Sequence, residues 1–291
     1  MNDDDQRLLF ELPPASGPEE LPRTKPISEP LWTRNKARLV QSYLRLFVQV
    51  TKHGTYLDGF AGPQEEDRPE MWAARLVLDI QLIRHFHWFE QRKASVDRLD
   101  ALRTEALAVD PTRSINIYPG DFNARILDVL GAGVIGAREA AFCLLDQRTF
   151  ECHWASVEAL AQHKTSGYKI ELFYFLAQKW MDRALHEKKD YAGLEAWWGR
   201  ADWSRVLGLK GPARAQLFAE RFREIGYRFV WPWPILEREA GMAPAIYYMI
   251  HATDHPAAPP LMGRAYEAAV VPVDDQQSSF GWPIRPHSQT R

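Results

Sequence analysis

The chain has 291 residues, of which 46% are hydrophobic, and a formal net charge of −2. This length is enough for one large domain or two small ones, and the small net charge excludes a general attraction to nucleic acid or to membranes, so any basic surface has to be local. The presence of only two cysteines, the lack of a recognisable signal peptide and the lack of an apolar run of membrane-spanning length predict a cytoplasmic protein with no membrane contact.

Composition divides the chain into three parts. Residues 1–28 are rich in Pro, Glu and Asp without periodicity, which predicts a disordered N-terminal arm. The tail over 270–291 is predicted to be loose as well. Residues 29–269 carry the hydrophobic patterns of one α/β domain.

Residues 31–52 form the first predicted helix, because apolar side chains recur at helical spacing on one face. The opposite face is basic, with Arg34, Arg38, Arg45 and Lys52. Such a stripe can hold the phosphates of a nucleic acid, although a solvated helix face gives the same pattern. Lys36 stands on the apolar side. We expect its stem to pass the core towards solvent, the alternative being an ammonium that points into a pocket.

The next stretch, 56–63, combines an apolar run with a small-residue turn, as a parallel strand does where it opens a nucleotide crevice. The turn holds Asp58, Gly59, Phe60 and Gly62. Glycine allows backbone conformations that other residues avoid and lets a ligand approach closely. Because an Asp-Gly-x-x-Gly sequence also forms ordinary turns, this stretch by itself leaves both interpretations open.

Three further predicted strands end on an acid, namely Glu90, Asp121 and Asp146. In an open α/β sheet a ligand lies outside the carboxyl ends of the strands, so acids at successive strand ends predict a nucleoside ligand. Capping of the following helix is the alternative for each acid. His85 and His87 share one side of the second strand, but no third ligand stands at a recognisable spacing, so we expect no metal site.

The remaining pattern completes the fold prediction. A helix is predicted over 71–83, and helical patterns between about 178 and 226 predict an insertion whose tryptophans include Trp197, Trp198 and Trp203. The β-rich runs 227–234 and 245–252 predict an antiparallel hairpin. Together these elements predict an α/β protein with a doubly wound, mostly parallel, Rossmann-like sheet, a C-terminal antiparallel hairpin and a helical insertion.

Several stretches carry a resemblance to a known superfamily. They are Trp32-Thr33 with Lys36 and Tyr43; Tyr56 to Pro63; Gly120 to Asn123; Leu145-Asp146 with Trp154; Lys169 to Phe175; and Ile246 to Pro256. In their order and spacing the chain resembles the S-adenosylmethionine-dependent methyltransferases. Within them it resembles the three-Cys-motif partner (TcmP) family, bacterial proteins named for a gene neighbour that carries three cysteines.

The resemblance implies a class I methyltransferase-type sheet and S-adenosylmethionine as the cofactor. It also implies that the turn after the first strand lies against the methionine end of the cofactor, through Asp58, Gly59, Phe60 and Gly62. Glu90 would hold the ribose. Asp121 would bind the adenine amino group and Phe122 would stack on the ring.

The acceptor side follows from the same resemblance, and here the chain departs from the family pattern. Asp146 would face the methyl acceptor, but Gln147-Arg148-Thr149-Phe150 replaces the Pro-Pro-aromatic sequence of enzymes that methylate base amino groups. Gln147 could accept a hydrogen bond and Phe150 could stack on a base. Arg148 suits an anionic acceptor or a backbone phosphate, and equally suits a loss of activity. A second departure is Gln64, where the family has glycine.

Two functions remain open at this point. In the first, the chain is a methyltransferase that acts on nucleic acid, with Asp146, Gln147 and Phe150 at the acceptor and the basic helix 34–52 on phosphates. In the second, it is a catalytically inactive protein that docks the three-cysteine neighbour through the tryptophans of the insertion, Trp197, Trp198 and Trp203. A magnesium-dependent nuclease has little support, because the acids stand at separate strand ends.

Overall fold

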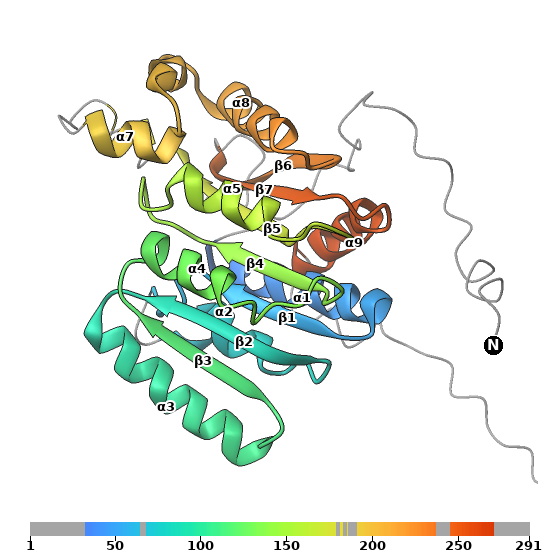
Figure 1. The fold of residues 1–291 in the computed structure, drawn as a ribbon. Coiled ribbons are helices and arrows are strands. Elements are labelled where there is room, and N and C mark those ends of the chain that lie inside the picture. The colour runs from blue at the N-terminus through green and yellow to red at the C-terminus, as the bar shows by residue number, and fades with distance from the viewer. Residues whose placement is uncertain are drawn as a thin grey trace, which may run out of the picture.

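The computed structural model describes residues 33–64, 68–178, 181, 182, 185, 191–236 and 245–270. They build a seven-stranded sheet with the order β3-β2-β1-β4-β5-β7-β6, which Figure 1 shows. The strands are β1 (Gly54–Asp58), β2 (Ile83–Glu90), β3 (Ser114–Pro119), β4 (Ala141–Leu145), β5 (Glu171–Ala177), β6 (Phe229–Leu236) and β7 (Ala245–Thr253).

The strand directions confirm the predicted fold class. β1 pairs in parallel with β2 and β4, and parallel pairing continues to β3 on one side and to β5 on the other. β7 runs antiparallel to both β5 and β6, so the last two strands are the predicted hairpin. Of this hairpin, the expected turn over 237–242 lies outside the described residues, as do the predicted N-terminal arm and the tail beyond residue 270.

Helices cover both faces of the sheet (Figure 1). They are α1 (Thr33–Thr51), α2 (Ala73–Val77), α3 (Lys93–Val109), α4 (Phe122–Gly131), α5 (Trp154–Gln162), α7 (Tyr191–Trp198), α8 (Gly211–Glu224) and α9 (Ala258–Val270), with the 3-10 helices η1 (Pro69–Met71) and η2 (Ala201–Val206). α1, α2, α3 and α9 pack on one face, and α4, α5, α7 and α8 pack on the other. The region predicted as a helical insertion thus contributes α7, η2 and α8.

Alternation along β4 shows how the sequence feeds both core layers. Phe142 and Leu144 pack with the layer of α1, whereas Cys143 and Leu145 pack with the layer of α5. Every residue of β4 is buried, as expected of a central strand that is covered on both faces.

The helix predicted over 71–83 is shorter than expected, because α2 ends at Val77. Two backbone carbonyls near its end bond to side chains from other elements. Gln41 Nε2 donates to the Leu76 carbonyl at 2.7 Å, and Arg113 Nη1 donates to the Leu78 carbonyl at 2.6 Å. These tertiary bonds take acceptors that a longer helix would use, and the chain turns into β2 instead.

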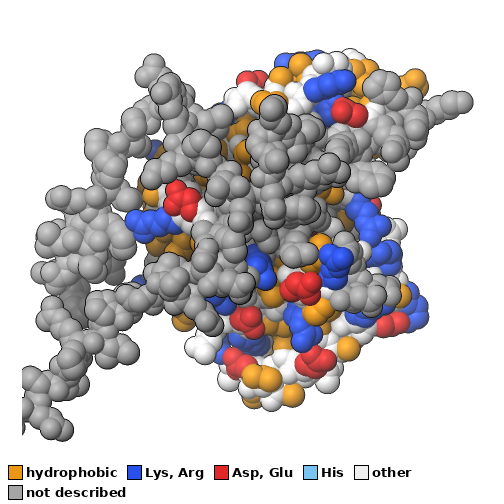
Figure 2. Space-filling model, turned by 180° about the vertical axis from the view of Figure 1, so that it is seen from behind, with side chains coloured by type: hydrophobic (Ala, Val, Ile, Leu, Met, Phe, Trp, Pro, Cys, Tyr) orange, Lys and Arg blue, Asp and Glu red, His pale blue; other side chains and the backbone are white. Residues whose placement is uncertain are grey.

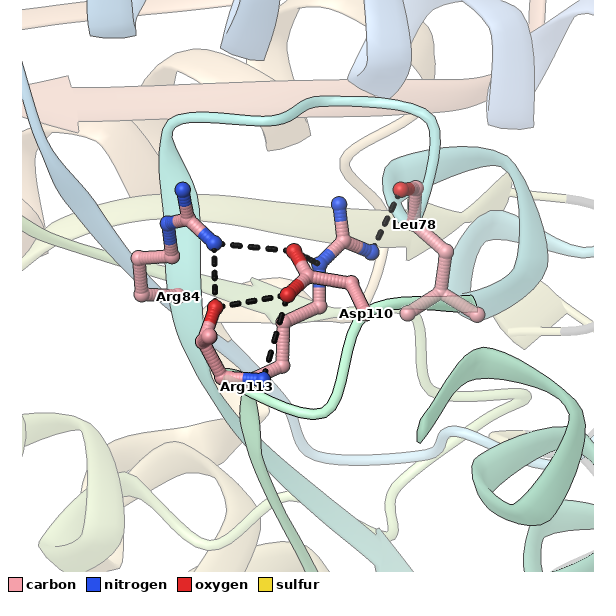
Figure 3. Close-up of polar contacts among 5 residues, drawn as sticks. Leu78, Arg84, Asp110 and Arg113 are labelled. Atoms are coloured by element: carbon pink, nitrogen blue, oxygen red, sulfur yellow. Dashed lines mark hydrogen bonds and ion pairs between the residues drawn. The ribbon is translucent and has the colours of Figure 1, made fainter. Parts of the chain in front are cut away.

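A charged cluster links the segments where β2 and β3 begin, as Figure 3 shows. Arg84 Nη1 lies 2.8 Å from Asp110 Oδ2, and Arg113 Nε lies 3.3 Å from the same oxygen. The hydroxyl of Thr112 donates to Asp110 Oδ1 at 2.6 Å, and this bond is the main reason why the pKa of Asp110 is lowered. The cluster joins the turns before β2 and before β3, at the end of the sheet away from the candidate site.

Candidate functional site

The strand order reverses between β1 and β4, and a crevice lies at the carboxyl ends of these two strands. This is where a ligand is expected in a doubly wound sheet. Its lining comes from α1, the turn after β1, the segment before α2, and the ends of β4 and β5. The lining side chains include Lys36, Val40, Asp58, Phe60, Gln64, Trp72, Asp146 and Phe175. The cavity volume is about 30 Å³, which is room for water and not for a nucleoside.

A buried ion pair crosses the crevice. Lys36 Nζ lies 2.7 Å from Asp146 Oδ1, and the two side chains are only 6% and 16% exposed. The ammonium also lies over two aromatic rings, 4.8 Å from the centroid of Phe175 and 4.6 Å from that of Tyr247. The expectation that the Lys36 stem passes the core towards solvent was therefore wrong, because a carboxylate and two ring faces compensate the burial of its charge.

Gln64 covers the other oxygen of the same carboxylate. Its Nε2 donates to Asp146 Oδ2 at 2.9 Å, although the Gln64 side chain itself is exposed. Asp146 is thus bound from both sides, by α1 and by the turn after β1. The Gln64 side chain covers Asp146 Oδ2, which a glycine at position 64 would leave open.

Asp58 forms the floor next to this pair. It is buried, and its carboxylate accepts bonds from the Tyr56 hydroxyl at 2.8 Å and from the Phe60 backbone N–H at 3.1 Å. The pKa of Asp58 is raised to about 7, chiefly by burial; the hydrogen bonds from Tyr56 and Phe60 lower it, and the nearby charges of Asp146 and Glu90 contribute to raising it. The acids at the ends of β1, β2 and β4 therefore lie close enough to influence one another.

Glu90 is turned towards the turn after β1 and does not line the crevice. Its Oε2 accepts a bond from the Gly62 N–H at 3.0 Å, and its Oε1 accepts one from the Arg92 N–H at 2.8 Å. A Cβ at Gly62 would lie 2.0 Å from Glu90 Oε2 and 2.7 Å from Ser95 Cβ. Glycine at this position is therefore required by the close approach of Glu90 to the backbone.

Asp121 and Phe122 lie apart from the crevice. Asp121 is exposed and caps α4, accepting a bond from the Ala124 N–H at 3.3 Å. Phe122 is buried in the layer of α4 and α5, where its ring centroid is 5.5 Å from Phe60 and 5.3 Å from Phe89. Of the strand-end acids, Asp58 and Asp146 share the crevice, Glu90 lies beside it, and Asp121 has the capping geometry that the sequence also allowed.

The residues after Asp146 point away from the crevice. Gln147 is buried, and its Oε1 accepts a bond from the Cys152 N–H at 3.0 Å. Phe150 packs edge-on against Trp197, with ring centroids 4.7 Å apart. Arg148 is exposed. Among the residues predicted at the methyl acceptor, only Asp146 lines the crevice.

The basic residues predicted on the first helix differ in exposure. Arg45 is exposed and Arg38 is partly buried, while the side chain of Arg34 lies outside the described residues. Lys52 follows the end of α1 in a left-handed backbone conformation, with φ 64°. Among the described side chains visible in Figure 2, cationic and anionic groups are interspersed.

Of the tryptophans predicted to dock a partner, two belong to the core. Trp197 and Trp198 are fully buried, and their indole N–H groups donate to Tyr174 and Asp202 at 2.9 and 2.7 Å. Trp203 is partly buried and stacks on the exposed Tyr191, with ring centroids 5.5 Å apart.

Sequence reasoning missed the role of Lys36 in the site, and also Trp72, Phe175 and Tyr247. The signal for Lys36 was its place on the apolar side of the helix. Phe175 and Tyr247 carried no signal, because aromatic residues in a strand are normally core. No helix among the described residues is long and apolar enough to cross a membrane. The described part of the chain also holds no group of three His, Cys, Asp or Glu side chains suited to a metal ion.

Comparisons with known proteins give a distant structural likeness. No protein-family model matches the chain, and no curated protein matches it either. Among solved structures, the methyltransferase domain of a bacterial Hen1 protein, CtHen1, aligns with 76% of this chain and 99% of its own, at 13% identity and a TM-score of 0.42. A likeness this distant leaves the function to the residues of the site.

Proposed function

We propose that the crevice binds S-adenosylmethionine and that the chain is a methyltransferase-like protein of the three-Cys-motif partner type. The observation that carries this proposal is the buried pair of Lys36 and Asp146 at the strand-order reversal, with the second carboxylate of Asp58 beside it. A lysine ammonium and an aspartate carboxylate in one crevice are complementary to the two charges of an α-amino acid. The methionine end of the cofactor is such a group.

Each charged residue has a role in this proposal. Lys36 leaves Asp146 and pairs with the carboxylate of the methionine end. Asp58 pairs with the ammonium of the methionine end. Asp146 is then released to accept a hydrogen bond from the methyl acceptor. When bound, S-adenosylmethionine supplies an electrophilic methyl group, and the chain has to hold the acceptor in line with it.

The amino-acid end fits the donor set, whereas the adenosine requires the crevice to widen beyond its present volume of about 30 Å³. Gln64 is the side chain that can open it. Its bond to Asp146 is made from an exposed position, so breaking it costs little, on the order of 1 kcal/mol. We therefore expect Gln64 to act as a cover that leaves when the cofactor binds.

Nucleic acid is the proposed methyl acceptor. α1 carries Lys36 into the crevice and Arg38 and Arg45 on its outer side, so a phosphate backbone held by this helix would lie beside the methyl donor. The exposed Arg148 stands two positions after Asp146 and is a further cation near that end of β4. Phosphate contacts of this kind position a substrate without reading its sequence.

A second candidate function is a catalytically inactive partner protein for a three-cysteine neighbour. The orientation of Gln147 and Phe150 favours it, because both side chains are packed in the core and neither reaches the crevice. The stacked pair of Tyr191 and Trp203 would then be the surface part of the insertion that meets the partner.

Isothermal titration calorimetry with S-adenosylmethionine tests the proposal. We expect a dissociation constant of about micromolar for the wild type, and tighter binding, by roughly fivefold, for Gln64→Gly, which removes the cover. Gly62 is left unchanged in all variants, because a side chain there would collide with Glu90. Absence of heat at millimolar ligand for both proteins would remove the cofactor from the account.

Methyl incorporation separates the two candidates. Labelled S-adenosylmethionine is incubated with total RNA and DNA, using wild type and Asp146→Ala. Incorporation by the wild type that Asp146→Ala abolishes supports the methyltransferase. Binding of the cofactor without any incorporation supports the inactive partner protein.

A further inference from the structure

A second and larger cavity lies at the opposite end of the sheet from the crevice. Its volume is about 350 Å³, within the range of small-molecule pockets. It is enclosed by the end of α1, the starts of β4 and β5, the end of β7 and the start of α9. In Figure 1 the parallel strands begin on the right-hand side, opposite the arrowheads of β2, β3 and β4, and the cavity lies at that end.

The walls of this cavity are largely aromatic and aliphatic. Tyr43, Phe47 and Leu261 line it. Val50 and Tyr168 line it as well and remain 39% and 50% exposed, which is high for large apolar side chains. Apolar groups that stay exposed around a hollow are typical of a ligand site.

One buried cation lines the cavity without a carboxylate partner. Lys164 is only 8% exposed, and its ammonium donates to the backbone carbonyl of Glu139. Within the described residues no carboxylate lies at ion-pair distance from Lys164 Nζ. An ammonium has three N–H donors, so this one bond leaves two of them for another acceptor. Burial lowers the pKa of Lys164, and the carboxylates of Glu139 and Asp254, which lie beyond ion-pair distance, partly oppose this effect.

The acids that share the cavity are engaged elsewhere. Glu171 accepts bonds from the Tyr43 hydroxyl, from His251 Nε2 at 2.6 Å and from Thr253 Oγ1 at 3.1 Å. The carboxylate of Glu139 accepts bonds from the Thr55 hydroxyl and, at 3.1 Å, from the Gly136 N–H. Arg138 and Lys169 also line the cavity, so its lysine and arginine side chains outnumber its two glutamates.

We propose that this cavity binds a small organic anion with an aromatic body, such as an aryl carboxylate. Its carboxylate pairs with Lys164, and its ring packs among Tyr43, Phe47 and Tyr168. Pairing with the anion removes the cost of burying the ammonium alone, which selects a charged ligand over a neutral one of the same shape. This site is separate from the crevice and does not depend on cofactor binding.

The test uses 1-naphthoate and its uncharged counterpart 1-naphthylmethanol, titrated by calorimetry into wild type and Lys164→Met. We expect naphthoate to bind the wild type at least tenfold more tightly than Lys164→Met, while naphthylmethanol binds both proteins equally. Lys93→Met removes an exposed lysine of α3, serves as the matched control and leaves naphthoate binding unchanged. Circular dichroism checks that each variant is folded.

A second variant keeps the proposal testable if Lys164→Met does not fold. Leu261→Trp fills the cavity from α9 and is expected to abolish binding of both compounds. Equal affinity of the wild type for naphthoate and naphthylmethanol would overturn the proposal, as would naphthoate binding that survives Leu261→Trp.

Discussion

At the scale of single residues, the pairing of Lys36 with Asp146 is the main basis for the function proposed for the crevice. The two residues are 110 positions apart in the chain, and both are largely buried where they meet. Removing one member of a buried pair leaves an uncompensated charge, whereas removing both is often nearly neutral. A buried pair is therefore weak evidence for stability, and the proposed ligand would use both of its charges.

The coupling between these two residues is directly measurable. Lys36→Met and Asp146→Asn should each lower the free energy of unfolding in urea by about 1–3 kcal/mol, and the double variant should lose much less than the sum. Gln64→Ala, which removes only the exposed bond to Asp146, is the control and should cost less than about 1 kcal/mol. Strict additivity of the two single changes would show that the pair is not coupled.

Asp58 gives a prediction about pH. Its folded-state pKa is raised to about 7, so the folded chain keeps a proton that the unfolded chain releases near pH 4. Between these values the unfolded state binds fewer protons, and the free energy of unfolding therefore falls as pH rises. Relative to Asp58→Asn, the wild type should lose roughly 2–4 kcal/mol between pH 4 and pH 8.

Urea unfolding at a series of pH values measures this effect. Tyr56→Phe is the informative companion, because it removes a hydrogen bond that lowers the pKa of Asp58. The wild-type dependence should therefore extend to higher pH in Tyr56→Phe. Parallel pH profiles for wild type and Asp58→Asn would contradict an elevated pKa at this position.

At the scale of elements, α1 joins the two halves of the proposed function. One face carries Lys36 and Val40 into the crevice, and the other carries Arg38 and Arg45 towards solvent. Because the two faces of α1 differ in this way, its outer face can bind a polyanion near the mouth of the crevice while the polyanion stays outside the crevice.

The role of α1 in nucleic-acid binding can be tested by charge reversal. Arg38→Glu with Arg45→Glu should weaken binding to a 30-nucleotide RNA and reduce the slope of log K against log salt by roughly 2. Arg103→Glu with Arg125→Glu makes the same change in net charge on α3 and α4 and is the control. Equal slopes for the two double variants, measured by fluorescence anisotropy, would exclude a specific role for α1.

At the scale of the whole molecule, the sequence predicted the sheet well and the site only in part. The apolar run ending in Asp146 indicated a central strand, because a run without polar alternation needs cover on both faces. Asp58 at the end of β1 lines the crevice, the position expected of an acid at the carboxyl end of a strand. Strand ends and turns are encoded by neighbouring residues, which makes them readable without tertiary information.

The remaining features depend on packing between distant segments. Whether Asp121 faces a ligand or caps α4 is a matter of side-chain direction, which a strand-end position leaves open. Gln147 and Phe150 turn into the core because Cys152 and Trp197 meet them there. Asp146, the partner of Lys36, lies 110 positions away in the chain. The position of Lys36 on an apolar helix face indicated only that its ammonium either reaches solvent or points into a pocket.

We propose above that the Lys36–Asp146 crevice holds the amino-acid end of S-adenosylmethionine. Calorimetry with S-adenosylmethionine and with 5′-deoxy-5′-methylthioadenosine, which lacks that end, tests it on wild type and Lys36→Met. We predict that Lys36→Met weakens S-adenosylmethionine about tenfold or more and leaves methylthioadenosine within about twofold. An equal loss for both compounds, or no loss for either, would contradict the claim.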